Sequence, residues 1–197
     1  MKLVLASKNQ KKLAEMNEIL SGLGVEVCSE AEAGVDLEVE ETGTTFEENS
    51  LLKARAVMEA SGLPAIADDS GLCVDALGGA PGVYSARYGG EGLDDPGRTR
   101  LLLENMRGQT PRTCRFVSVI TCCFPNGDVL SARGECEGTV AYAPVGENGF
   151  GYDPVFFVPE LKKTFAQLSP QEKNARSHRG RALEAFQVKL EEYLKNR

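Results

Sequence analysis

The order of the first predicted elements constrains the fold of this chain more than any other feature. Residues 2–6 are a short apolar run that predicts a buried strand, and residues 25–28 predict a second one. Between them, apolar side chains recur at helical spacing over residues 10–20, and glycines end the pattern. A strand–helix–strand opening is typical of an α/β protein.

The rest of the sequence predicts a mixed sheet flanked by helices. A helix is expected over residues 45–61, where Thr45 and Glu48 fit a capping box. The step from Asn126 to Gly127 predicts a hairpin, so at least one strand pair is expected to be antiparallel. Further strands are expected at residues 65–68, 72–75, 112–124, 129–141 and 155–158, and further helices from Asp95, from Ser169 and over residues 181–195.

Length, charge and cysteine usage limit the classes of function. The 197 residues are consistent with one two-lobed domain spanning residues 1–197, or with two small domains. The formal net charge of −7 disfavours a nucleic acid polymer as partner, whereas a few local cations or a divalent metal can still hold a small anion. No apolar stretch is long enough to span a bilayer, so no membrane partner is expected. The six cysteines form no C-x-x-C pair and are expected to be free thiols of a cytoplasmic protein.

Two acidic segments are candidate metal sites. Glu40 and Glu41 lie in a loop before the capped helix, and Mg²⁺ favours carboxylates together with waters and phosphate oxygens. Asp68 and Asp69 follow a short apolar run. If the chain stays extended, their side chains point to opposite faces, and one can hold a metal and take a proton from water. The structural alternatives are a solvated acidic face for the first segment and an Asx turn for the second.

A polar segment between the first strand and the first helix is a candidate phosphate site. Ser7, Asn9 and Lys12 add side-chain donors to the free N–H groups expected at a helix N-terminus. The segment matches neither a Walker A loop nor a dinucleotide fingerprint. The alternative is ordinary helix capping followed by a lysine-rich helix face.

Two further segments are candidate parts of a functional site. Residues 149–154 contain two aromatics, two glycines and an acid, which fit a loop that stacks on a base and accepts from its ring N–H. A tight turn with core aromatics is the alternative. His178, the only histidine, lies among cationic residues, and a structural role is its alternative. No Ser–His–Asp set or H-E-x-x-H motif is present, so nucleophilic and zinc mechanisms are disfavoured.

Together these segments resemble the inosine-triphosphate pyrophosphatase family, which acts on abnormal purine nucleotides. The resemblance implies an elongated α/β fold with two lobes around a central mixed sheet, a nucleotide cleft between the lobes, and a homodimer. Ser7 stands at a position where threonine is also common. The matching stretches run in family order over essentially the whole chain, at residues 7–12, 40–49 with Lys53, 67–71, 78–88, 150–154, and 172–174 with 177–180.

The resemblance also implies an activity and a role for each matching residue. The activity is Mg²⁺-dependent hydrolysis of ITP, dITP or XTP between the α and β phosphates, giving a nucleoside monophosphate and pyrophosphate. Glu41 and Asp69 would serve the Mg²⁺ site, and Asp69 would also be the catalytic base. The implied substrate-binding residues are Ser7, Lys8, Asn9, Gln10, Lys11, Lys12, Lys53 and Ser70, with Phe150, Gly151, Tyr152, Asp153, Lys173, His178 and Arg179 forming the base and sugar pocket.

Hydrogen bonding explains how such a pocket can select its base. The oxo group at purine position 6 accepts a hydrogen bond, which Arg179 or Lys173 can donate, and the N1–H donates one, which Asp153 can accept. Adenine presents the opposite pattern, and sites built on such bonds can discriminate by roughly 10⁴ or more. Guanine shares the 6-oxo and N1–H pattern, so these residues do not predict its exclusion.

Two other functions remain to be separated from this one. A pyrophosphatase on a related fold would act instead on modified pyrimidine triphosphates. A non-catalytic nucleotide sensor would bind a triphosphate without turnover, although the presence of both Glu41 and Asp69 argues against it. Release of pyrophosphate from ITP in the presence of Mg²⁺ separates the sensor from the enzymes, and a substrate panel separates the enzymes from each other.

Overall fold

One mixed sheet runs through the computed structural model, which describes residues 1–196. Its strand order is β2-β1-β3-β4-β5-β6-β7, and β1 pairs in parallel with both β2 and β3. The pairs β5–β6 and β6–β7 are antiparallel. The strands are β1 Lys2–Leu5, β2 Glu26–Ser29, β3 Ala65–Val74, β4 Thr113–Cys123, β5 Val129–Val140, β6 Phe156–Val158 and β7 Lys163–Thr164. The predicted α/β class with a mixed, helix-flanked sheet is therefore confirmed.

The helices begin and end close to where the sequence pattern predicts them. Thr45 caps the second helix through a complete capping box with Glu48, and Asp94 caps the third, whose first turn contains Pro96. The last helix begins at His178, earlier than the predicted residue 181, so Arg179 lies in its first turn. The helices are α1 Gln10–Leu20, α2 Phe46–Ser61, α3 Asp95–Asn105, α4 Pro170–Asn174 and α5 His178–Lys195.

Strand β3 differs from the prediction. Two short extended segments were expected, at residues 65–68 and 72–75, with a turn between them as the alternative, but Ala65–Val74 is one continuous strand of ten residues. The Asx turn considered for Asp68 and Asp69 is therefore wrong. The reason is that the Asp68 carboxylate accepts from distant side chains rather than from its own backbone, so nothing bends the chain there.

The chain divides into two compact units. Unit 1 comprises residues 1–69, 118–134 and 178–196, as far as the structure describes them, and unit 2 comprises residues 70–117 and 135–177. Residue 197, the last residue of the predicted domain, lies outside the described part. Within residues 1–196, no helix combines the length and the apolar character that crossing a bilayer requires.

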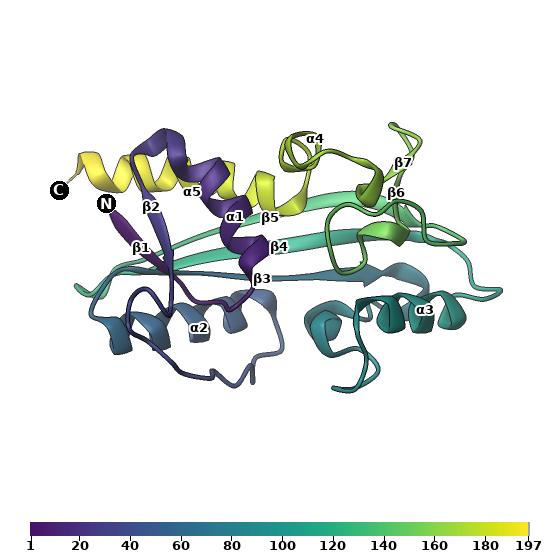
Figure 1. Ribbon diagram of the computed structural model, residues 1–197, viewed down its shortest axis with the longest axis horizontal. Coiled ribbons are helices and arrows are strands. Elements are labelled where there is room, and N and C mark those ends of the chain that lie inside the picture. Colours follow the sequence, from purple (N-terminus) through teal and green to yellow (C-terminus); the bar gives the residue numbers. More distant parts are fainter. Residues whose placement is uncertain (197) are drawn as a thin grey trace. The chain divides into compact units, whose positions relative to one another are not determined.

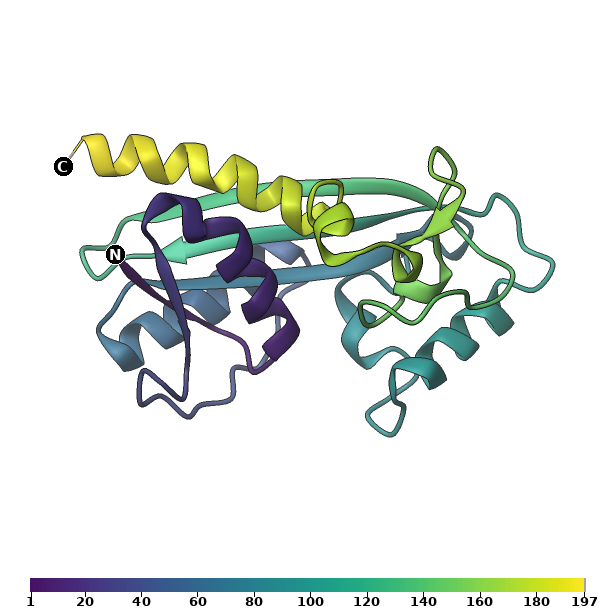
Figure 2. The same ribbon diagram turned by 45° about the horizontal axis from the view of Figure 1, so that its top comes forward.

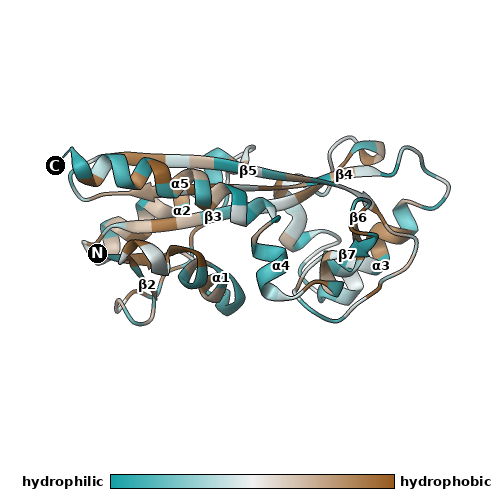
Figure 3. Ribbon diagram, turned by 90° about the horizontal axis from the view of Figure 1, so that it is seen from above, coloured by the Kyte–Doolittle hydropathy of each residue, from teal (hydrophilic) through white to brown (hydrophobic). Residues whose placement is uncertain are grey.

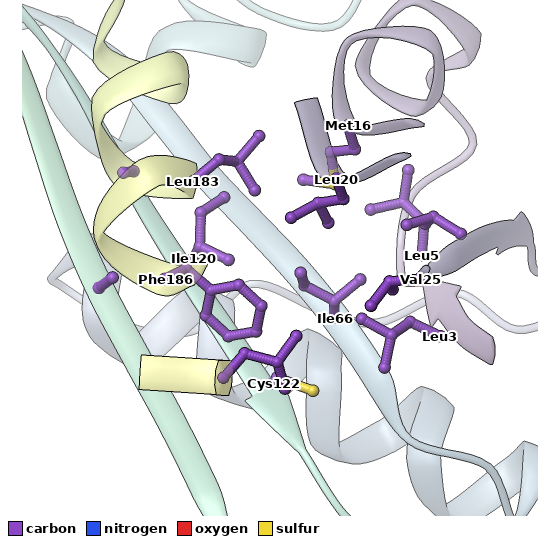
Figure 4. Close-up of a cluster of buried hydrophobic side chains, with 14 of the residues drawn as sticks. Leu3, Leu5, Met16, Leu20, Val25, Ile66, Ile120, Cys122, Leu183 and Phe186 are labelled. Carbon is purple, nitrogen blue, oxygen red and sulfur yellow. The ribbon is translucent and has the colours of Figure 1, made fainter. Parts of the chain in front are cut away.

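Unit 1 has a core on each face of its part of the sheet. Helices α1 and α5 lie side by side on one face, and α2 covers the other (Figure 1 and Figure 2). The α1/α5 core includes Met16, Ile66 and Phe186, which Figure 4 shows converging with their neighbours. The α2 core includes Ala54 and Ala67. Each face of the strands is thus buried by a different helix layer, as expected for parallel strands.

Unit 2 is built around a separate aromatic core. Phe116, Phe156 and Phe165 pack together, with ring centroids 4.4 to 5.6 Å apart. Leu102 of α3 and Leu72 of β3 belong to the same cluster. In Figure 3, α3 and α5 carry both polar and apolar colours, because each buries only one face. The six cysteines are free thiols, as predicted.

Candidate functional site

Adjacent residues of β3 send two carboxylates to opposite faces of the sheet. In an extended strand, side chains alternate between faces. Ile66 belongs to the core under α1 and α5, whereas Ala65 and Ala67 belong to the core under α2. By the same alternation, Asp68 faces α1 and α5, and Asp69 faces α2. The sequence prediction of opposite faces is confirmed, and each carboxylate has its own set of partners.

Asp68 is the centre of a buried charge cluster, which we call the Asp68 cluster (Lys12, Glu15, Asp68, Ser118 and Arg179). Its Oδ2 lies 2.8 Å from Lys12 Nζ and accepts from Arg179 Nη2 at 3.0 Å. Its Oδ1 accepts from Ser118 Oγ at 2.5 Å, and Arg179 also pairs with Glu15. Burial alone would raise the pKa of the Asp68 carboxyl, but Arg179 and Lys12 outweigh burial and hold it well below its usual range. Asp68 is therefore a permanently charged anchor for two cations.

Asp69 belongs to a second arrangement on the α2 face, which we call the Asp69 site (Glu41, Lys53 and Asp69). Lys53 of α2 places its Nζ 3.0 Å from Asp69 Oδ1 and 3.0 Å from Glu41 Oε1. The same Nζ donates to the backbone carbonyl of Asp68 at 3.1 Å. One lysine thus fixes both carboxylates that were predicted to hold a metal, and it joins the Glu41 loop to β3.

One oxygen of the Asp69 carboxylate is not used in any hydrogen bond within residues 1–196. Its Oδ2 is buried and has no hydrogen-bond partner within residues 1–196. Burial raises the pKa of Asp69, although the attraction of Lys53 acts in the opposite direction. Burial lowers the pKa of Lys53, but Asp69 and Glu41 more than compensate and raise it. A buried, unpartnered carboxylate oxygen with a raised pKa has the chemistry of a general base or a metal ligand.

The start of α1 is capped rather than open. Asn9 is its N-cap, and its side-chain oxygen accepts from the N–H groups of Lys11 and Lys12 at 3.0 and 3.2 Å. Two of the N–H groups considered for a phosphate, those of Lys11 and Lys12, are thus satisfied by the Asn9 side chain in this structure. Ser7 Oγ accepts from the Asn9 N–H at 3.1 Å, and Lys8 forms an exposed pair with Asp36. The side chains of Gln10 and Lys11 are exposed.

Unit 2 contains the second predicted group, in the loop at residues 149–153. Asp153 Oδ2 accepts from the Phe150 N–H at 3.0 Å and from Lys173 Nζ at 2.8 Å, and both charged side chains are buried. Lys173 Nζ also lies 4.7 Å from the Phe150 ring centroid, a cation–π distance. The structure therefore brings Phe150, Asp153 and Lys173 together. Gly149 has φ +72°, and a Cβ there would collide with Asp153 Oδ2, so this position requires glycine.

Two neighbouring loop residues are tied to the rest of unit 2. The Gly151 N–H donates to Asp95 Oδ2 at 2.9 Å, which connects the loop to the start of α3. Tyr152 is buried, and its hydroxyl donates to the Ser85 carbonyl at 2.6 Å. Burial raises the pKa of the Tyr152 hydroxyl, so it stays protonated as a donor. Tyr152 thus supports the loop from the core side.

Arg179 or Lys173 was expected to donate to the 6-oxo group of the base. The structure places Arg179 in the Asp68 cluster of unit 1, paired with Asp68 and Glu15. His178 lies beside it in α5 and is buried, whereas Ser70 continues β3 into unit 2 and is half-buried. In this arrangement, Arg179 organises the charges on the α1/α5 face.

Sequence reasoning missed Glu15 and Ser118. Glu15 lies three residues after Lys12 in α1, so both side chains emerge on one helix face, and this spacing was a usable signal. Ser118 lies inside the apolar run of β4, where a lone hydroxyl gives no indication of its partner. Its contact with Asp68 depends on the pairing of distant strands.

The Asp69 site fits a hard divalent cation better than a zinc-type site. No group of three or more His, Cys, Asp or Glu side chains is close enough to hold a metal in the part of the chain that the structure describes. Mg²⁺ typically takes only one or two carboxylates and completes its shell with waters and substrate phosphates. Glu41 and Asp69, whose carboxylates lie 3.0 Å from the same Lys53 Nζ, are such a pair of carboxylates.

A model of the Ham1 family matches residues 3–189, almost the whole chain. The chain belongs to the Ham1 family. Among solved structures, the Ham1 protein of Staphylococcus aureus is 44% identical and covers 98% of this chain and 100% of its own, with a TM-score of 0.88. A HAM1 protein from Coxiella burnetii is 46% identical, covers 98% and 99%, and has a TM-score of 0.90. The similarity in three dimensions thus extends over the full Ham1 fold.

Two relatives with similar sequences carry the same name. A dITP/XTP pyrophosphatase of an Exiguobacterium species is 49% identical to this Ham1-family chain, over 99% of this chain and 100% of its own. A dITP/XTP pyrophosphatase of Thermus thermophilus is 51% identical, over 94% and 90%. The family predicted from the six short motifs is therefore confirmed over the whole length.

Proposed function

We propose that this chain hydrolyses ITP, dITP and XTP to the nucleoside monophosphate and pyrophosphate, and so keeps abnormal purines out of DNA and RNA. Relatives that are about half identical over nearly their full length are named for action on dITP and XTP. The observation that carries the mechanism is the Asp69 site, in which one lysine holds two carboxylates and one buried carboxylate oxygen has no partner.

Phosphate binding is assigned to the buried lysines. A triphosphate carries several negative charges, and displacement at phosphorus depends mainly on positioning and on neutralising those charges. Lys12 and Lys53 are both largely withdrawn from solvent, each anchored by an aspartate of β3. A lysine fixed in this way loses little further conformational entropy when it binds a phosphate oxygen.

Asp69 is assigned the proton transfer. Water attacks the α-phosphorus, the bond from the α-phosphorus to the bridging oxygen breaks, and pyrophosphate leaves with the bonding electrons. The proton of the attacking water passes to Asp69 Oδ2, the oxygen that has no protein partner. The raised pKa of Asp69 suits this role, because a carboxylate with a higher pKa is a stronger base.

Mg²⁺ dependence is part of the proposal. Glu41 and Asp69 would hold the ion, since Lys53 already keeps both carboxylates within reach of one another. When bound there, Mg²⁺ supplies positive charge to the phosphate oxygens. Lys53 then serves as the fixed link that keeps the acidic loop against β3.

Selection of the base is assigned to the loop of unit 2. Lys173 donates to the 6-oxo group and Asp153 accepts from N1–H, while the Phe150 ring offers a stacking surface. In the free protein, Lys173 and Asp153 satisfy each other at 2.8 Å, and both are buried. A base that lacks either matching group would leave a buried charge unpaired, which is costly.

A substrate panel tests the proposal. The purified protein is incubated with ITP, dITP, XTP, ATP and modified pyrimidine triphosphates, with Mg²⁺ or with EDTA, and pyrophosphate and monophosphate are quantified by chromatography. We expect rapid release from the first three and little from the others. Preferred cleavage of a modified pyrimidine triphosphate would contradict the substrate assignment. Tight binding of ITP without any product would support a sensor instead.

The same proposal includes two further properties, a homodimeric state and a cytoplasmic location. Analytical ultracentrifugation of the purified protein measures the first property, because a dimer has twice the monomer mass of 21.2 kDa. Fractionation of the source cells measures the second. A monomer at working concentration would remove the dimer from the proposal without affecting the chemistry.

A further inference from the structure

A cavity of about 330 Å³ lies in unit 2 and is lined by none of the residues assigned above. The C-terminal half of α3 and the turn after it form one wall, and Arg112 and Tyr142 form another. Its volume is at the lower end of the range found for small-molecule sites. The lining contains three guanidinium groups, of Arg100, Arg107 and Arg112, and one carboxylate, of Glu104. The cavity is therefore locally cationic in a chain whose net charge is −7.

Arg112 is fixed as a platform. Its Nε donates to the Val140 carbonyl at 2.9 Å, its Nη1 to the Met106 carbonyl at 3.2 Å and its Nη2 to the Ala141 carbonyl at 2.9 Å. The Tyr142 ring lies on this guanidinium, with its centroid 4.1 Å from Cζ. Arg112 thus donates three hydrogen bonds to backbone carbonyls and holds a tyrosine ring in place.

The Tyr142 ring has an uncovered face. Tyr142 is 84% exposed, far more than the other large apolar or aromatic side chains of the described chain. An exposed ring that is already held in one orientation loses little entropy when a planar ligand stacks on it. Stacking of a nucleobase on an aromatic side chain contributes about 1–3 kcal/mol by alanine substitution and depends little on the identity of the base.

Arg100 and Arg107 are the available cations of the cavity. Both side chains are exposed, and within residues 1–196 their guanidinium groups form no ion pair or hydrogen bond, even with Glu104. Both line the cavity, Arg100 from α3 and Arg107 from the turn after it. Two unpaired guanidinium groups bind a phosphate group through short, charge-assisted hydrogen bonds.

We propose that this cavity is a non-catalytic binding site for a nucleoside monophosphate. Its phosphate lies between Arg100 and Arg107, and its base stacks on Tyr142. The site lies wholly in unit 2, uses none of the residues assigned to hydrolysis and does not depend on the proposed function. Because every base has a stacking face and the arginines contact only phosphate, the site accepts different bases.

The chain contains no tryptophan, so Tyr142→Trp creates a single fluorescent reporter at the site. Adenosine 5′-monophosphate is titrated into this variant in the presence of EDTA. We expect saturable quenching, with adenosine and ribose 5-phosphate each binding about tenfold more weakly or worse, because each lacks one half of the recognition. Adding Arg100→Ala and Arg107→Ala is expected to raise Kd by about tenfold or more. The matched control, Arg55→Ala with Arg176→Ala, removes the same charge from exposed positions elsewhere and is expected to leave Kd unchanged.

Equilibrium dialysis with the unmodified tyrosine checks that the reporter does not create the site. The Arg100→Ala, Arg107→Ala protein is expected to bind fewer equivalents of adenosine 5′-monophosphate than the wild type. Circular dichroism melting of each variant confirms the fold. Equal affinity for adenosine alone or for ribose 5-phosphate alone would overturn the proposal, as would a control variant that loses binding equally. Quenching that follows protein concentration rather than ligand would also overturn it, because a second copy of the chain would then occupy the cavity.

Discussion

Arg179 and Asp68 lie 3.0 Å apart, with side-chain exposures of 2% and 0%, although they are 111 residues apart in the sequence. Asp68 also pairs with Lys12, so one fully buried carboxylate balances two cations from different helices. In such a cluster the loss of one member leaves the others charged and unsatisfied, which costs far more than the net contribution of the intact pair.

Asp68→Asn is therefore expected to destabilise unit 1 strongly. Removing one partner of a buried ion pair costs roughly 3–5 kcal/mol. Urea denaturation followed by circular dichroism measures the change in unfolding free energy. The matched control is Asp36→Asn, which breaks the exposed pair with Lys8 and is expected to cost at most about 1 kcal/mol. Equal effects of the two substitutions would contradict the anchoring role of Asp68.

Asp69→Asn is expected to have the opposite profile, with a folded protein and little turnover. The amide keeps the shape of the side chain and can still accept from Lys53, but it cannot take a proton. General-base catalysis contributes about 10²–10⁴-fold, so kcat for ITP is expected to fall by that factor. Steady-state kinetics and a thermal melt test both halves of the prediction. Near-normal turnover would remove the base role from Asp69.

Glu41→Gln tests the metal assignment. Loss of one carboxylate charge is expected to raise the Mg²⁺ concentration needed for half-maximal activity and to lower activity at fixed Mg²⁺. A titration of Mg²⁺ against initial rate compares the variant with the wild type. Glu40→Gln is the matched control, since it lies one residue earlier in the same loop. The assignment fails if activity survives in EDTA, or if both variants give the wild-type titration.

Lys53→Ala and Asp153→Asn are expected to separate phosphate from base recognition. A phosphate contact is shared by all nucleotides, so Lys53→Ala is expected to lower kcat/KM for ITP and ATP by similar factors. Asp153→Asn replaces the carboxylate that accepts from the nucleobase. It is expected to lower the preference for ITP over ATP, measured as the ratio of their kcat/KM values, by a factor equivalent to roughly 1–3 kcal/mol. Measuring kcat/KM for both nucleotides in both variants shows which residue contacts the phosphates and which contacts the base. The assignments are reversed if Lys53→Ala changes the ratio and Asp153→Asn does not.

Gly134→Ala is expected to destabilise the contact between β5 and α5. A Cβ at this position would meet the backbone of His178 and Ala182, which cannot move without shifting the helix. Overpacking of this kind costs about 1–3 kcal/mol. Gly92→Ala is the control, because a Cβ there has no neighbour within 4 Å and is expected to be neutral or stabilising by up to about 1 kcal/mol. Denaturant midpoints of the two variants give the comparison.

The sequence predicted correctly those elements whose formation depends on residues close together in the chain. The period of α1, the capping box at Thr45 and the hairpin at Gly127 depend on neighbours within a few residues, and all three are found. The continuous strand β3 was not predicted, because Asp68 and Ser70 resemble turn residues until their distant partners are known. Local propensity was overridden there by tertiary contacts.

Only some features of the candidate site could be predicted from the sequence. The structure brings together Glu41, Lys53 and Asp69, to which the family resemblance assigns metal and phosphate binding, and those roles stay predictions. The position of Arg179 does not follow from the sequence, since it depends on α5 bringing its first turn against α1 and β3. The two carboxylates of β3 look equivalent in the sequence. Only the opposite faces of the sheet give one an anchoring environment and the other an unpartnered oxygen.

The alternation along β3 restricts how the length of this gene segment can change. Each added residue advances an extended strand by about 3.3 Å and turns every later side chain to the other face. Inserting one residue between Ala65 and Asp68 would place Asp68 against α2 and Asp69 against α1 and α5, exchanging their surroundings completely. Deleting one residue would do the same. Viable length variants of this segment are therefore expected to differ by even numbers or not at all, a parity rule that a library of in-frame insertions and deletions would reveal.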